Sequence, residues 1–214
     1  KKISKRFKKL SALKANVKNI SVEDAIKKVK ENCTTKFDES IDVSFRLNIK
    51  QKKEDFSLRT NVNLPHGNGK KIKVAVLCED SKLNDAKVSG ADTYGSDDLV
   101  QKITDGKINF DKLVSTPAMM SKMGKLGKIL GPKGLMPNPK LGTVTNNIKS
   151  VVKALKTGQI EIKNDKDGNI GASIGKKSFS TNKIIENFKA FIQTIKKAKP
   201  NGIKGDFILS SFLT

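Results

Sequence analysis

The chain has 214 residues, of which 43 are Lys or Arg and 21 are Asp or Glu, so its formal net charge is +22 at pH 7. A charge of this sign and size favours a polyanionic partner such as RNA, DNA or an anionic membrane surface, and argues against a neutral catalytic module. Only three of the basic residues are Arg, which favours contact with phosphates over dense readout of base edges.

The two cysteines, Cys33 and Cys78, lie far apart and form no CxxC pair, so we expect neither a disulfide framework nor a zinc site. No apolar run approaches the ~18 residues of a membrane-spanning helix, and residues 1–6 lack the apolar core of a secretory signal. We therefore expect a cytoplasmic protein without a membrane partner.

In chain order, the first predicted element is a helix over residues 22–32, capped by Ser21. Apolar residues then alternate with polar ones from Ile41 to Ile49, which predicts a strand with one solvated face, as in an antiparallel sheet.

The middle of the chain has a different pattern. Residues 72–78 and, more weakly, 108–114 are continuous apolar runs, and helical stretches follow each of them. Ser96 is the expected N-cap of one of these helices. Buried strands that alternate with helices predict a parallel sheet covered on both faces.

Near the other end, residues 159–163 and 169–174 predict two strands joined by a turn over residues 164–168. Apolar residues at helical spacing predict a helix over 183–197, and residues 207–213 predict a further strand.

The pattern changes at residues 65–69 and at Thr157-Gly158. We therefore predict a fold of α/β and α+β class with two domains. Residues 1–66 and 157–214 form a split α+β sandwich, and residues 67–156 form an inserted, three-layer Rossmann-like α/β domain. The two crossings would act as a hinge at Pro65, Gly67 and Gly158.

The basic residues are unevenly distributed. Nine lysines and no acidic residue lie between Lys112 and Ile160, and eight basic residues and no acidic one lie between Lys1 and Val22. Solvated surfaces usually interleave both signs, so these tracts predict contact with nucleic acid. Lys122, Lys125 and Lys128 recur every third residue and predict a helix with one basic face that lies along phosphates, while its Met and Leu residues fill the core.

Residues 131–143 form a loop with three prolines, three glycines and two lysines. A stiff loop loses little entropy on binding, and glycine allows phosphate to approach the backbone. The same composition also suits a plain structural connector.

Residues 127–143 resemble the signature of the ribosomal large-subunit protein one family, the protein of the lateral stalk. Further motifs in family order extend the resemblance almost from end to end: residues 36–40, 64–67, 89–92, 179–180 and 204–205. The resemblance implies the split domain with an insertion. It implies a bacterial or organellar type of protein that is monomeric when free, cytoplasmic and ribosome-bound, and that uses no cofactor.

The resemblance also implies the partners. These are the large-subunit ribosomal RNA stalk near the exit site, deacylated tRNA whose release the protein assists, and the protein's own mRNA, on which similar bacterial proteins act as translational repressors. The family's main RNA-binding surface falls on these positions: Lys36, Phe37, Glu39, Ser40, Lys176, Ser178 and Thr214. Secondary RNA contact is expected in the rigid loop, at Lys133, Gly134, Pro137, Asn138 and Lys140.

Two of these expectations carry an alternative. Phe37, close to Ile41, suits a core residue as well as a contact with the RNA sugar surface. Family members usually continue beyond the last strand into a Thr-Met-Gly-Pro tail that touches RNA, whereas this sequence stops at Thr214.

Three rival functions fit the sequence less well. Residues 171–177 have three residues between glycines where a phosphate-binding loop needs four, and Lys177 stands where Ser or Thr is required. The single histidine, His66, lies in a Pro/Gly turn, so we predict no catalytic residue and no metal. A DNA-binding protein would ordinarily show a recognition helix rich in Arg, Asn or Gln, and none stands out.

Overall fold

The computed structural model describes residues 3–14, 20–48, 58–200 and 205–214. Their contacts group into two compact units, the first made of Lys1–Leu58 and Lys163–Thr214 and the second of Arg59–Ile162. Both contain helices and sheets, so the expected mixture of α and β structure is confirmed. Ile49 of the predicted strand, Lys204 of the last motif and parts of the basic tract over residues 1–22 lie outside the described residues.

The first unit contains a three-stranded sheet in which β1 (Ser40–Leu47) is central. It pairs antiparallel with β7 (Asn169–Lys176) on one side and β8 (Ile208–Leu213) on the other. Along β1 every second side chain is buried and the others are exposed. The predicted strand with one solvated face is therefore confirmed, and the exposed side is an open, largely polar face of the sheet.

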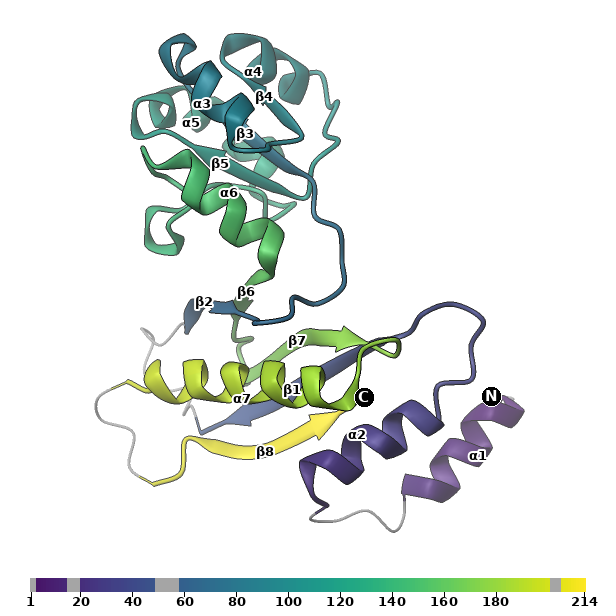
Figure 1. Cartoon of the computed structure of the whole chain (residues 1–214). Coiled ribbons are helices and arrows are strands. Elements are labelled where there is room, and N and C mark those ends of the chain that lie inside the picture. The colour runs from purple at the N-terminus through teal and green to yellow at the C-terminus, as the bar shows by residue number, and fades with distance from the viewer. Residues whose placement is uncertain (1–2, 15–19, 49–57, 201–204) are drawn as a thin grey trace. The chain divides into compact units, whose positions relative to one another are not determined.

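Helix α7 (Thr181–Lys197) covers the other face of this sheet (Figure 1). The ring of Phe191 stacks on that of Phe45 with centroids 5.6 Å apart, and Phe188 lies 6.0 Å away, so aromatic contacts fix the helix on the strand. The unit also contains α1 (Lys5–Lys14) and α2 (Val22–Glu31). Ser21 caps α2 as predicted, its hydroxyl accepting from the backbone N–H of Asp24 at 3.2 Å.

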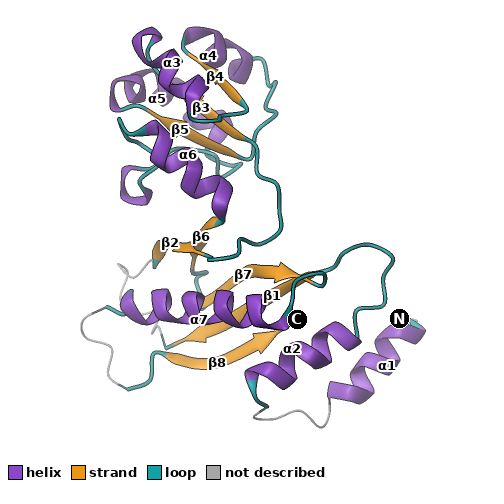
Figure 2. Ribbon diagram, in the orientation of Figure 1, coloured by secondary structure: helices purple, strands orange, loops and turns teal. Residues whose placement is uncertain are grey.

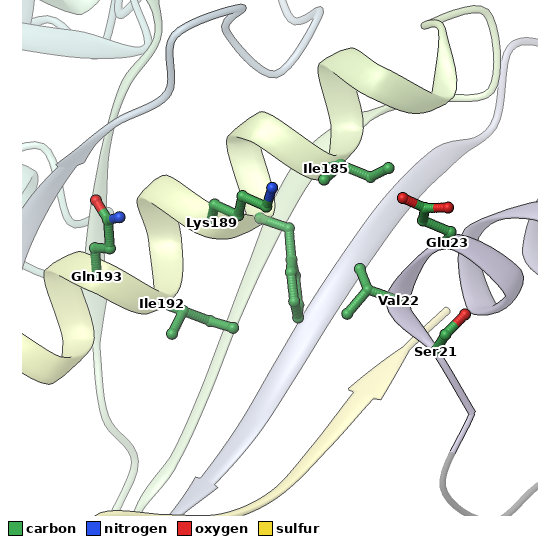
Figure 3. Close-up of a pocket in the computed structure, with 8 residues that line it drawn as sticks. Ser21, Val22, Glu23, Ile185, Lys189, Ile192 and Gln193 are labelled. Atoms are coloured by element: carbon green, nitrogen blue, oxygen red, sulfur yellow. The ribbon is translucent and has the colours of Figure 1, made fainter.

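A groove of about 440 Å³ separates the start of α2 from α7. Figure 3 shows Val22 of α2 facing Ile185 and Ile192 of α7 across it. Its lining is mostly apolar, with one carboxylate, Glu23, and one ammonium, Lys189.

The second unit contains a parallel sheet with β3 (Val74–Leu77) between β4 (Thr93–Gly95) and β5 (Lys112–Ser115). Val74 and Val76 pack with α3 (Leu83–Val88) and α6 (Ile148–Thr157), whereas Ala75 and Leu77 pack with α4 (Asp97–Thr104) and α5 (Met120–Leu130). Helices thus cover both faces of the sheet (Figure 2). Short 3₁₀ turns span Asp80–Lys82, Pro117–Met119 and Pro139–Leu141.

The two strands predicted around the turn at residues 164–168 are confirmed as β6 (Gln159–Lys163) and β7. They belong to different sheets, since β6 pairs with β2 (Arg59–Asn63). The carboxylate of Asp165 accepts hydrogen bonds from the backbone N–H groups of Asp167 and Asn169 and so stabilises the turn. This turn connects the β2-β6 sheet to the β7-β1-β8 sheet. Ser96 does precede α4, but its side chain makes no capping hydrogen bond.

Two of the predicted hinge residues touch each other within the second unit. Gly158 ends α6 with φ +122°, and a Cβ built on it would lie 2.4 Å from the Cα of Gly67, itself at φ +64°. Gly158 requires glycine for its backbone angle and for space, whereas Gly67 requires it for its backbone angle alone. Pro65 is exposed in the turn that precedes Gly67. The hinge itself remains a prediction.

Candidate nucleic-acid interface

The fold brings together the two segments that carry most of the expected primary site. Residues 36–40 lead into β1 and residues 176–178 follow β7, and Ser40 lies directly opposite Lys176 in the antiparallel register. Side chains of directly opposed residues lie on the same face of a sheet. Ser40 and Lys176 therefore flank each other at one end of the open face.

Asp38 joins the two segments. Its carboxylate accepts from the backbone N–H of Ser178 at 3.0 Å and from the Ser178 hydroxyl at 2.8 Å. The hydroxyl hydrogen bond, followed by the backbone one and the charges of Lys176 and Lys177, outweighs partial desolvation and holds the pKa of Asp38 below its ordinary value. We call this pair the Asp38–Ser178 clasp. Asp38 was not among the predicted site residues.

Three lysine ammonium groups reinforce the junction by donating to backbone carbonyls. Lys176 donates to Asp38 at 3.2 Å, Lys177 donates to Cys33 at 2.6 Å, and Lys30 donates to Phe179. The backbone N–H of Lys177 also donates to the carbonyl of Glu39 at 2.9 Å. Charge-assisted hydrogen bonds are stronger than neutral ones. Part of the basic charge near the site therefore fixes the loop before β1.

Phe37 is 69% exposed, so it is not a core residue, and the core alternative is set aside. Lys36 is exposed beside it, whereas Glu39 is half-buried. An exposed phenyl ring with lysines near it offers a surface on which a sugar or a base can stack. The loop before β1 thus presents an aromatic ring and a cation together.

Thr214 extends the β1–β8 ladder. It exchanges two backbone hydrogen bonds with Asp42, at 2.8 and 2.9 Å, and its side chain is exposed. Two residues along the same ladder, Phe212 lies opposite Ser44 and is 58% exposed. A second exposed aromatic ring therefore lies on the open face.

The five residues expected to make secondary RNA contact differ in their exposure. Lys133, Gly134 and Lys140 are exposed, and Gly134 has φ +66° in open space. Pro137 is buried, and Asn138 binds its own loop, its side-chain oxygen accepting from the backbone N–H of Lys140 at 2.9 Å. Of these five residues, only Lys133, Gly134 and Lys140 are exposed to a ligand in this structure.

In the folded protein, several lysines of the acid-free tract over residues 112–160 pair with carboxylates from outside the tract. Lys112 pairs with Glu161 at 3.1 Å, Lys122 with Asp97 at 2.5 Å, and Lys156 with Asp92 at 3.0 Å. On α5, Met123, Leu126 and Leu130 fill the core as predicted, and the three lysines are exposed. Since Lys122 already has a partner, the basic face of α5 is weaker than the sequence suggests.

Other chemistries find no support in the described part of the chain. Residues 171–176 lie in strand β7 and are not followed by a phosphate-binding loop, and His66 is exposed in its turn. Across residues 3–14, 20–48, 58–200 and 205–214, no three His, Cys, Asp or Glu side chains cluster as a metal site would need. No helix within those ranges has the length and apolar character to cross a bilayer.

Comparison with known proteins adds independent findings. The family described as "Ribosomal protein L1p/L10e family" matches residues 29–214. The "Large ribosomal subunit protein uL1" of Pelagibacter ubique (strain HTCC1062) is 56% identical over 212 residues, covering 99% of this chain and 93% of the relative. The protein of the same name from Prochlorococcus marinus (strain NATL1A) is 48% identical over 214 residues, covering 100% of this chain and 91% of the relative.

Proposed function

The chain belongs to the ribosomal protein L1p/L10e family, and from this premise we propose that it binds the lateral stalk of large-subunit ribosomal RNA through the open end of the β7-β1-β8 sheet. As a member of that family it is a structural, RNA-binding protein of the large ribosomal subunit and not an enzyme, and its place is on the cytoplasmic ribosome. The stalk as target and the residues that contact it are the proposal.

One observation carries it: the fold gathers Phe37, Ser40 and Lys176 from two distant stretches of sequence at one end of a polar face. Structured RNA is recognised by stacking on exposed bases or sugars, by hydrogen bonds to 2′-OH groups and by contacts with phosphates. An exposed ring, a hydroxyl and an ammonium supply one group for each. Thr214 and Phe212 extend the surface along β8.

The test is a competition between an RNA hairpin of the stalk sequence and a scrambled RNA of equal length and charge. Counterion release acts on both equally, so any preference reports the specific contacts. We expect the full chain to bind the stalk RNA at least ~10³-fold more tightly at physiological salt, the lower end of specific recognition of nucleic acid. Equal affinities would overturn the proposal.

The remaining roles follow from the same surface. Because the protein would recognise one folded RNA, a segment of its own mRNA with the same fold would compete for the site, which supports the proposed repressor role. A role in the release of deacylated tRNA is proposed from the family resemblance alone. A titration of the stalk complex with the protein's own mRNA leader tests the first, and displacement that fails at saturation would contradict it.

A further inference from the structure

We propose that Asp38 and Ser178 are positioning residues of the RNA site, so that Ser178 acts through Asp38 and not by touching RNA. This inference rests on the proposed function and assigns to Ser178 a different part from the direct contact that the family resemblance implies. It concerns how the loop of residues 33–40 reaches its binding conformation before any RNA arrives.

Both hydrogen-bond donors of Ser178 are already engaged with Asp38. The hydroxyl of Ser178 donates to one oxygen of the Asp38 carboxylate at 2.8 Å, and its backbone N–H donates to the other at 3.0 Å. A serine hydroxyl has one proton to donate. A 2′-oxygen of RNA that accepted this proton would have to displace a carboxylate, which is a stronger acceptor than a neutral oxygen. An RNA phosphate would have to displace an acceptor that is charged like itself.

Asp38 lies between two residues of the proposed contact surface. Phe37 precedes it and is exposed, and Ser40 begins β1 two residues later. The same loop is held at Cys33 by the ammonium of Lys177 and at Glu39 by the Lys177 backbone N–H. The clasp thus adds a hold at Asp38, next to Glu39, to a loop that Lys177 already binds at Cys33 and at Glu39. Together these contacts restrict the backbone on which Phe37 and Ser40 lie.

The negative charge of Asp38 has an effect of its own on RNA binding. A carboxylate beside a surface that binds a polyanion weakens binding electrostatically, and removing one should strengthen it. Asp38 is tolerated here because Lys176 and Lys177 lie near it, and both favour its charged form. Positioning and charge therefore predict changes of opposite sign when Asp38 is removed, and the sign of the measured change distinguishes them.

The experiment compares Asp38→Ala with Asp206→Ala, which removes an exposed carboxylate from the same unit. For the stalk RNA we expect Asp38→Ala to weaken binding by roughly three- to thirtyfold, because affinity falls in proportion to the fraction of chains with the loop in place. Asp206→Ala should leave affinity unchanged or slightly higher. If Asp38→Ala binds as well as the parent chain or better, the positioning role is overturned.

A double-mutant cycle tests the pairing. Ser178→Ala breaks the hydroxyl hydrogen bond but keeps the one from the backbone N–H, so it should lose part of the affinity that Asp38→Ala loses. The double variant should lose no more than Asp38→Ala alone, because the carboxylate that Ser178 acts through is already gone. Ser178→Thr, which keeps the hydroxyl, should recover the loss. The slope of affinity against salt should not change in Ser178→Ala, because no phosphate contact disappears. Losses that multiply in the double variant would instead make Ser178 a direct contact.

Hydrogen exchange without RNA separates this inference from the proposed function. Ser178→Ala should speed the exchange of the backbone amides in residues 36–40 without altering exchange in β3 of the second unit. If exchange changes in this way and the parent chain shows no preference for stalk RNA, the stalk assignment fails while the clasp stands as an ordering device. Unchanged exchange in the loop overturns the clasp whatever the RNA result.

Discussion

Gly158 approaches Gly67 so closely that a Cβ on Gly158 would lie 2.4 Å from the Cα of Gly67 and 3.1 Å from the carbonyl oxygen of Leu64. Two backbone segments, one before β3 and one after α6, are in direct contact there. Any side chain at Gly158 must push one of them away, and its φ of +122° is unfavourable for every other residue.

We therefore expect Gly158→Ala to lower the free energy of unfolding by about 3 kcal/mol or more, since backbone strain and overpacking add. The matched control is Gly90→Ala, at φ +80° with nothing within 4 Å of the added Cβ, which should cost only the strain of ~1–2 kcal/mol. Urea denaturation of both variants checks the difference. Equal losses would show that the contact between the two glycines yields easily.

Phe37→Ala should weaken binding of stalk RNA by ~1–3 kcal/mol, the range for an aromatic contact with nucleic acid. Because the ring is 69% exposed, the free energy of unfolding should stay within ~0.5 kcal/mol of the parent value. Val88→Ala, at a side chain 70% exposed in the second unit, is the control and should change neither quantity. A loss of stability as large as the loss of affinity would make Phe37 a structural residue.

RNA affinity should depend steeply on salt. If the complex neutralises ~5 phosphates, affinity falls by roughly two to three decades between 50 and 200 mM salt. Lys176→Gln should reduce the slope by about one, whereas Lys122→Gln should change it less because Lys122 is paired with Asp97. Filter binding over a salt series measures the slopes. A flat response in the parent chain would show that the exposed lysines are solvated surface.

Acid should destabilise the second unit partly through Glu161. Burial alone would raise the pKa of this carboxyl, but hydrogen bonds from Lys112 and Arg59, together with their charges, outweigh burial and lower the pKa below the usual 4.5. A lowered folded pKa contributes stability that is present above the unfolded pKa and lost as pH falls through the folded value.

Glu161→Gln should thus lower the urea midpoint at pH 7, and the gap from the parent chain should narrow below pH 4.5. Asp105→Asn, at an exposed position of the same unit, serves as the control and should shift the midpoint little at either pH. If the gap widens in acid, the sign assigned to the pKa shift is wrong.

The two units should separate at the boundary that the contacts indicate. Leu58 and Asn164 tie the ends of the insertion together, with the Leu58 N–H donating to the Asn164 side-chain oxygen at 2.6 Å and the Asn164 N–H donating to the Leu58 carbonyl at 3.1 Å. Replacing residues 59–162 by a short Gly-Ser linker should leave a folded first unit that still prefers stalk RNA over scrambled RNA. Preference carried by residues 59–162 alone would relocate the site.

Much of the fold was predictable because the spacing of apolar residues along each helix or strand matches the residues that are buried there. Examples are the alternation of apolar and polar residues in β1, the continuous apolar run of β3 and the apolar stripe of α7. Each pattern depends only on which faces of that one element are buried. The partner of β6 was not predictable in this way, because a turn at Asp165 looks the same whether it closes a hairpin or passes the chain to another sheet.

The site was predictable in part and for a different reason. Phe37 and Lys176 came from the family resemblance, since nothing in composition distinguishes an exposed phenylalanine from a buried one. Asp38 escaped because its partner, Ser178, lies far away in sequence. The pairing of Lys122 with Asp97 escaped for the same reason: runs of one charge in a sequence say nothing of which opposite charges the fold supplies.

The central place of β1 also sets an order of events during synthesis. Its hydrogen-bonded neighbours, β7 and β8, are translated long after it, once the whole of the second unit has been made. At ~5–20 residues per second, β1 waits for several seconds with both edges open. Asp42 and Arg46 on its exposed face discourage pairing with other chains in that interval. The proposed RNA-binding surface is therefore among the last parts of the nascent chain to form.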